Sequence, residues 1–167
     1  SITVEDGALK VSRKGKDGWL WNKSEDEAVI TVVMPLLHRV SVKGSGDMTV
    51  KGTASDHFSI ALAGSGDIAV IGLQTAKTSV QLAGSGDVVI EGSTDQLDAG
   101  LAGSGDIRAE KLVVRNAKIS LAGSGDVNAR VRGAASVSLM GSGDVRITGT
   151  RNCSTSKVGS GNVTCVE

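Results

Sequence analysis

The tetrapeptide Gly-Ser-Gly-Asp recurs along this chain at a nearly constant interval. Six complete copies begin at Gly44, Gly64, Gly84, Gly103, Gly123 and Gly141. An altered seventh copy begins at Gly159 and ends in Asn162, and successive copies are 18 to 20 residues apart. A repeat this short and regular is typical of a solenoid, in which each repeat forms one rung and buries its apolar face on its neighbours.

Apolar and polar residues alternate on both sides of each tetrapeptide. Around the third copy, Val80 and Leu82 precede Gly84, whereas Val88 and Ile90 follow it. The other five complete copies also carry apolar residues at these four places. This period of two predicts strands with one buried face. Helix is disfavoured because a pair of glycines interrupts every candidate stretch.

Each rung is therefore predicted to consist of a strand, a tight corner, a second strand and a looser return. Like positions of consecutive rungs then stack as parallel strands, about 4.8 Å apart. The predicted fold is all-β: a single-stranded parallel β-helix, or β-solenoid, with about seven rungs of 18–20 residues. A right-handed coil is favoured because crossovers between parallel strands usually have that hand.

The chain is expected to form one domain, because 167 residues is an ordinary domain length. Residues 34–167 are assigned to the solenoid and residues 1–33 to a small antiparallel β cap. Asp6-Gly7 is a hairpin-turn signal within this cap. Three stretches of it alternate as strands do: Ser1–Glu5, Leu9–Arg13 and Ala28–Met34. Such a cap protects the edge of the first rung from pairing with other chains.

Composition excludes two classes of partner. The 18 acidic and 18 basic residues balance, and the basic residues are scattered along the chain. Without a basic stripe or a set of stacking aromatic residues, nucleic acid is not an expected partner. No apolar run approaches the roughly 20 residues of a membrane-spanning helix.

The corner aspartates are the most conspicuous candidate site. They are Asp47, Asp67, Asp87, Asp106, Asp126 and Asp144, with Asn162 at the seventh corner. Stacked carboxylates repel one another and need compensation. In the structural interpretation each side chain accepts backbone N–H bonds within its own corner, a role that Asn162 could also fill. In the alternative interpretation the carboxylates bind a cation such as Ca²⁺ between rungs. The first interpretation predicts no metal and no cofactor.

Trp19 and Trp21 share one face of their segment if it is extended. A pair of exposed tryptophans can form a platform on which sugars stack. The same pair can instead pack on the open end of the solenoid as part of the cap. Both interpretations remain open from the sequence.

Cys153 and Cys165 lie in the last rung, in columns that point inward. Thr155 and Lys157 occupy the positions where the preceding rung has Val137 and Leu139. Two cysteines in the one rung with polar core positions suggest a structural disulfide that stabilises the end of the chain. A disulfide would imply an oxidising compartment; two buried free thiols are the alternative.

The repeated Gly-Ser-Gly-Asp followed by alternating Val and Ile resembles a bacterial family known as the head GIN domain of putative autotransporter adhesins. The resemblance covers about residues 28–166 and includes the segment Val32–Leu36 that leads into Val42–Asp47. It implies a β-helical domain that is periplasmic, attached to the outer membrane or extracellular. It supplies no catalytic residues.

Three functions are compatible with these observations. The first is a non-catalytic adhesin or cell-envelope scaffold that binds a surface protein or a glycan. The second is a polysaccharide lyase or hydrolase, for which the acids near the return loops, Glu91, Asp95, Asp98 and Glu110, would have to be paired. The third is a structural protein that assembles into homo-oligomers. The sequence favours the first and predicts no catalytic residues.

Overall fold

The computed structural model describes residues 2–12 and 29–167, and none of these residues is helical. The chain divides into two compact units, Ser1–Val33 and Met34–Glu167. The division lies between residues 33 and 34, and whether the two units form one domain remains a prediction. Within the described ranges there is accordingly no helix that could span a membrane.

The first unit contains an antiparallel hairpin of β1 (Ile2–Glu5) and β2 (Ala8–Val11). Asp6 and Gly7 form its two-residue turn with φ angles of 52° and 74°. Positive φ at both positions is the geometry that an Asp-Gly hairpin turn requires. The predicted first two strands are thus confirmed.

The predicted third strand of the cap is wrong where the structure describes it. Val29–Met34 belongs to no strand, and Val33 is 93% exposed. Alternation alone could not reveal this, because a strand also needs a partner to satisfy its backbone groups. Whether residues 1–33 cap the solenoid remains a prediction.

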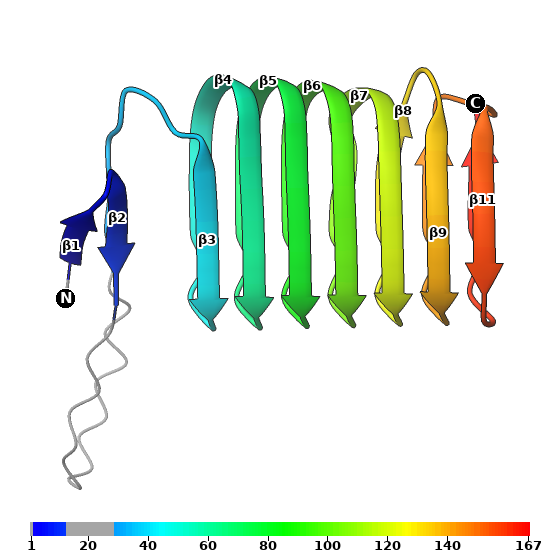
Figure 1. The fold of residues 1–167 in the computed structure, drawn as a ribbon, viewed down its shortest axis with the longest axis horizontal. Helices are drawn as coiled ribbons and strands as arrows, with labels where there is room; N and C mark the ends of the chain where they lie inside the picture. The colour runs from blue at the N-terminus through cyan, green and yellow to red at the C-terminus, as the bar shows by residue number, and fades with distance from the viewer. Residues whose placement is uncertain (1, 13–28) are drawn as a thin grey trace, which may run out of the picture. The chain divides into compact units, whose positions relative to one another are not determined.

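The second unit is a parallel β-solenoid (Figure 1). Its strands are β3 (Arg39–Gly44), β4 (Met48–Gly64), β5 (Ile68–Gly84), β6 (Val88–Gly103), β7 (Ile107–Gly123), β8 (Val127–Val131), β9 (Ala135–Gly141), β10 (Val145–Thr148), β11 (Cys153–Val158) and β12 (Val163–Val166). They descend on the near side of Figure 1 and rise on the far side as the chain advances from β3 to β11, which makes the coil right-handed. The seven corners, from Gly44 to Gly159, delimit six turns of the coil.

Strand register confirms the predicted columns. Leu82 pairs with Leu62 on one side and with Leu101 on the other. These leucines point into a core that runs the length of the coil, and Leu82 and Leu101 are 2% and 3% exposed. Aliphatic side chains suit this core because each one stacks on a like side chain of the next rung.

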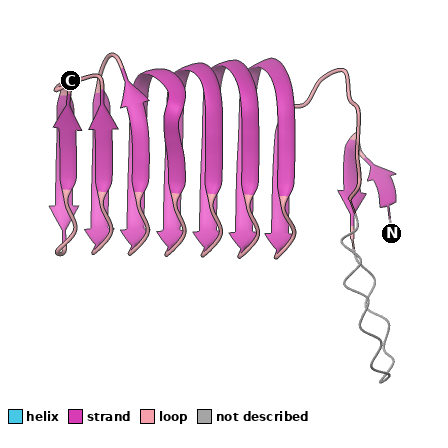
Figure 2. Cartoon of the chain, turned by 180° about the vertical axis from the view of Figure 1, so that it is seen from behind, coloured by secondary structure: helices cyan, strands magenta, loops and turns pink. Residues whose placement is uncertain are grey.

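The predicted looser return is not a loop in β4, β5, β6 or β7. Each of these strands remains continuous around the bend, whereas loops lie at the opposite, Gly-Ser-Gly-Asp edge (Figure 2). Gly52 and Gly72 allow the bend, with φ angles of 62° and 76°. In the next rung the return is a loop, because residues 132–134 separate β8 from β9.

Candidate functional site

The corners are built from two columns of stacked glycines. The first glycine of each tetrapeptide has a positive φ, for example 136° at Gly84. Its carbonyl oxygen accepts two N–H groups of the next rung, at 2.9 Å from Ser104 and 3.2 Å from Gly105. A Cβ atom on Gly84 would collide with the carbonyl oxygen of Gly64. Close backbone stacking therefore requires glycine here, in addition to the backbone conformation.

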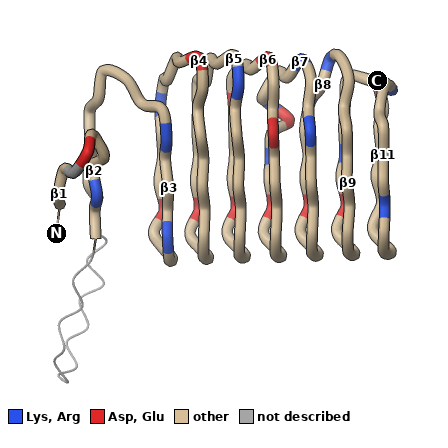
Figure 3. The backbone as a smooth tube through the Cα atoms, in the orientation of Figure 1, with Lys and Arg blue, Asp and Glu red and all other residues tan. Residues whose placement is uncertain are grey.

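The corner aspartates form a ladder of side chain to backbone hydrogen bonds. The Oδ1 atom of Asp67 accepts the backbone N–H of Asp87 at 2.9 Å. The same bond recurs at every step from Asp47 to Asn162, with lengths between 2.8 and 3.1 Å. The corners are thus linked from rung to rung by their own side chains. Figure 3 shows the acidic positions, in red, recurring from rung to rung near this edge of the coil.

The prediction that each aspartate accepts N–H bonds within its own corner is therefore wrong in one respect. The acceptor is as expected, but the donor belongs to the next rung, because the corner N–H groups point along the coil axis toward the preceding corner. Among residues 2–12 and 29–167, no three His, Cys, Asp or Glu side chains are grouped so that they could hold a metal ion.

Arg108 compensates charge at the centre of this ladder. Its Nη2 atom lies 3.0 Å from Oδ2 of Asp87 and 3.2 Å from Oδ2 of Asp106. The hydrogen bond to Asp106, with the attraction of Asp87, raises the pKa of the guanidinium above its ordinary value. Sequence reasoning missed this contact. Its signal is an arginine two residues after a corner aspartate, where the three preceding rungs have Thr49, Ala69 and Val89.

The acids considered for catalysis do not come together as a pair. Glu91 binds Lys111 at 3.0 Å, and Asp95 binds Arg115 at 3.1 Å. In both cases the base lies one rung further along the chain. Asp98 and Glu110 form no ion pair within the described part of the chain. Glu91 and Asp95 therefore form ion pairs between neighbouring rungs instead of a pair of acids.

A polar pocket of about 200 Å³ lies beside the last corners. Its lining comes mainly from the corner column and the column two residues further on, and comprises Asp126, Asn128, Asp144, Val145, Arg146, Asn162 and Thr164. Arg146 follows Asp144 as Arg108 follows Asp106, yet it makes no ion pair with a carboxylate of the residues described. The pocket thus combines a guanidinium group that has no ion-pair partner among the described residues with carboxylate, amide and hydroxyl groups.

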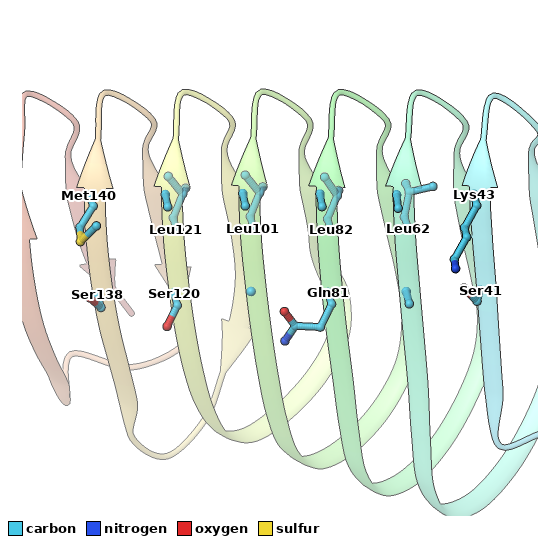
Figure 4. Close-up of a pocket in the computed structure, with 16 residues that line it drawn as sticks. Ser41, Lys43, Leu62, Gln81, Leu82, Leu101, Ser120, Leu121, Ser138 and Met140 are labelled. Carbon is cyan, nitrogen blue, oxygen red and sulfur yellow. The ribbon is translucent and has the colours of Figure 1, made fainter.

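A shallow apolar groove of about 480 Å³ lies on the sheet face formed by β3, the later halves of β4 to β7, and β9 (Figure 4). Its floor contains Leu62, Leu82, Leu101 and Leu121. Most outward positions around it are small, such as Gly100 and Ala102, whereas Lys43, Gln81 and Met140 are large. This groove has no signal in the sequence, because its residues are ordinary members of the repeat.

The predicted disulfide between Cys153 and Cys165 is present, with the two Cα atoms 6.6 Å apart. It joins β11 to β12 within the last rung, where Thr155 and Lys157 are exposed. Trp19 and Trp21 lie outside the described residues, so both of their interpretations remain predictions.

Comparison with known proteins agrees with the resemblance noted from the repeat. The family model described as putative auto-transporter adhesin, head GIN domain, matches residues 1–150. The chain is also similar to the crystal structure of a putative adhesin from Bacteroides fragilis, with 26% sequence identity and a TM-score of 0.87. That similarity covers 100% of this chain and 76% of the other. No curated protein matches the sequence.

Proposed function

Because the chain belongs to the head GIN domain family of putative auto-transporter adhesins, we propose that it is a non-catalytic adhesion module that binds a glycan outside the cytoplasm. The rigid solenoid is the scaffold, and the polar pocket near the last corners is the proposed binding site. Function must be argued from such a site, since solenoids serve many unrelated purposes.

The observation that carries this proposal is that Arg146 lies in the pocket and forms no ion pair with the described residues. Its counterpart Arg108 forms ion pairs with Asp87 and Asp106. Arg146 instead stands between Asn128 and Thr164 in adjacent strands, beside Asp144. Sugar hydroxyls are both donors and acceptors, so they suit a pocket that offers both. A small, open and polar pocket of this kind fits one or two sugar units of a longer chain.

A location outside the cytoplasm is supported by the disulfide. Cys153 and Cys165 are the only cysteines in the sequence, and they are joined. Structural disulfides persist in oxidising compartments and are rare in the cytosol. The family description adds independent support, since an adhesin acts at the cell surface.

The proposal is tested by glycan-array binding with the oxidised chain and two arginine variants. Arg146→Ala removes the guanidinium from the pocket and should lower binding at least about tenfold, as expected when a charged hydrogen bond is lost. Arg130→Ala, an exposed change on the neighbouring strand β8, is the matched control and should bind as the wild type does. Equal binding by both variants would exclude the pocket.

The enzymatic alternative is separated by product analysis. Incubation of each bound polysaccharide with the chain should release no new reducing ends and no unsaturated products. Release of either product, abolished by changes at Glu91 or Asp95, would replace the adhesion proposal with a lyase or hydrolase activity.

A further inference from the structure

One face of the solenoid combines an apolar column with columns of mostly small polar residues, and no other element of the second unit covers it. It is formed by the outward residues of β3, the later halves of β4 to β7, β9 and β11, and is called the outer sheet face below. Its most apolar column begins with Lys43 on β3 and continues with Ala63, Ala83, Ala102, Ala122, Met140 and Val158. Met140 and Val158 are 58% and 69% exposed.

We propose that two copies of this chain pack through their outer sheet faces, with the coil axes antiparallel. The two-fold axis runs along the strand direction, between β6 and β7. Each column then faces the same column of the second copy, with the order of the rungs reversed. Such an isologous contact closes on itself as a dimer.

Side-chain size is the first argument for this arrangement. From β4 to β11, which are the strands that overlap, the two large residues of the apolar column lie at the C-terminal end and the small residues at the N-terminal end. Reversal of the rung order places Met140 opposite Ala83 of the second copy, and Val158 opposite Ala63. Large side chains then fill the space above small ones, whereas a parallel arrangement would set each large residue against its own copy.

Charge is the second argument, and it fixes the register. A column beside the alanines contains Asp98 on β6 and Lys118 on β7, which are register partners. Asp98 is half-buried and neither residue forms an ion pair within the described ranges. With the two-fold axis between these strands, Asp98 of each copy faces Lys118 of the other.

Other registers leave charges opposed or unmatched. Moving the axis onto β6 sets Asp98 against Asp98, and moving it onto β7 sets Lys118 against Lys118. Of the other charged outward residues described on this face, Arg39 and Lys43 lie on β3, and Lys77 lies on β5 beside the bend, at the edge of the face. In the proposed register β3 extends beyond the second copy, so neither Arg39 nor Lys43 is buried.

The area is sufficient for a weak dimer. Six overlapping strands, each with about six residues on the face, cover about 600 Å² per copy from ordinary strand spacings. The total of about 1,200 Å² is at the lower limit of specific interfaces. We therefore expect dissociation constants on the order of 10 to 100 µM.

Sedimentation equilibrium of the oxidised 167-residue chain tests this inference. The wild type should dimerise reversibly within the concentration range just given. Ala102→Arg places a bulky charge at the centre of the face and should raise the dissociation constant at least about tenfold. Ala76→Arg is the matched control, because Ala76 is exposed on β5 away from this face, and it should change the constant less than about twofold.

Charge reversal tests the register. Asp98→Lys alone and Lys118→Asp alone should each weaken the dimer, because each creates two like-charge contacts across it. The double variant restores opposite charges and should dimerise as the wild type does. Circular dichroism melting curves should show that every variant remains folded.

A wild type that stays monomeric at the highest concentration overturns the inference. So does equal weakening by Ala102→Arg and Ala76→Arg. Failure of the double variant to recover overturns the register. The dimer does not depend on the proposed glycan site, so loss of one leaves the other intact.

Discussion

Single residues in this fold are constrained chiefly by the rung that precedes them. The second glycine of each corner illustrates this, because its φ is not in the left-handed region. Gly86 is nevertheless required, since a Cβ there would collide with the carbonyl oxygen of Gly66. Gly46 occupies the same place in the first corner, and a Cβ there meets nothing within 4 Å. The same residue in the same motif therefore has different constraints at different rungs.

This difference gives a paired prediction. Gly86→Ala should lower the free energy of unfolding by more than about 2 kcal/mol, because backbone must move to admit the methyl group. Gly46→Ala should change it by less than about 0.5 kcal/mol, as surface substitutions usually do. Urea denaturation of both variants measures the two values. Similar losses would show that the motif is required for a reason other than stacking.

A second prediction concerns the core column. Leu101→Ala should lower the free energy of unfolding by about 2–5 kcal/mol, because it leaves a cavity between stacked leucines. Gln81 is exposed on the neighbouring strand, and Gln81→Ala should be nearly neutral. Thermal or urea unfolding of the two variants checks the assignment, which fails if both substitutions are tolerated alike.

At the scale of the element, the corner ladder joins rungs that are distant in sequence. Each aspartate satisfies a backbone N–H group 18 to 20 residues further along the chain. This explains why the altered corner ending in Asn162 still fits, since its backbone N–H donates to Oδ1 of Asp144 at 2.8 Å. Among the residues that the structure describes, Arg108 alone forms an ion pair with the column, between Asp87 and Asp106.

Asp67 provides the test of this ladder. Asp67→Ala leaves the N–H of Asp87 without its acceptor and should cost about 1 kcal/mol. Asp67→Asn keeps an acceptor oxygen and should cost less. Chemical denaturation of both variants measures the difference.

The cation alternative is checked separately by chelation. Addition of EDTA should leave the melting temperature unchanged, because the ladder is satisfied by backbone donors. A large drop in melting temperature, reversed by Ca²⁺, would instead support a metal between the rungs.

The regularity of the repeat decides which features could be predicted from the sequence. The columns containing Leu82 and Leu101 could be aligned because the repeat marks equivalent positions directly. The donor to Asp67 could not be identified, since the sequence names an acceptor but not the direction of the corner N–H groups. Val29–Met34 alternates as a strand does, but alternation does not supply a pairing partner. Arg146 and Arg108 both stand two residues after a corner aspartate, so this spacing could not show that Arg146 forms no ion pair with the described residues.

At the scale of the whole solenoid, the C-terminal end is the least apolar part. Thr155 and Lys157 pair in register with Val137 and Leu139 of the preceding rung. Hydrophobic burial is therefore weaker there, and the bond between Cys153 and Cys165 compensates by restricting the unfolded chain.

Reduction of this bond should destabilise the last rung first. In the chain-entropy model a loop of this length contributes about 2–3 kcal/mol. Hydrogen exchange after reduction should speed up in β11 and β12 before it does in β5 and β6. The oxidised protein, unfolded without reductant, should show no titratable thiol; two thiols would contradict the bond.

The parallel stacking of rungs also has a mechanical consequence. The hydrogen bonds between successive strands lie along the coil axis. Tension between the two ends of the coil therefore acts on the hydrogen bonds of one rung after another. The coil should then unzip one rung at a time at low force, instead of resisting by shear as strands pulled along their own length do. Each opened rung would release a slack of about 60 Å, from 18 to 20 residues at about 3.4 Å each less the rung spacing. Cys153 and Cys165 are 12 residues apart in the sequence, and the disulfide between them would prevent the segment they enclose from extending. A tether built in this way would yield stepwise under drag and re-form when the load falls.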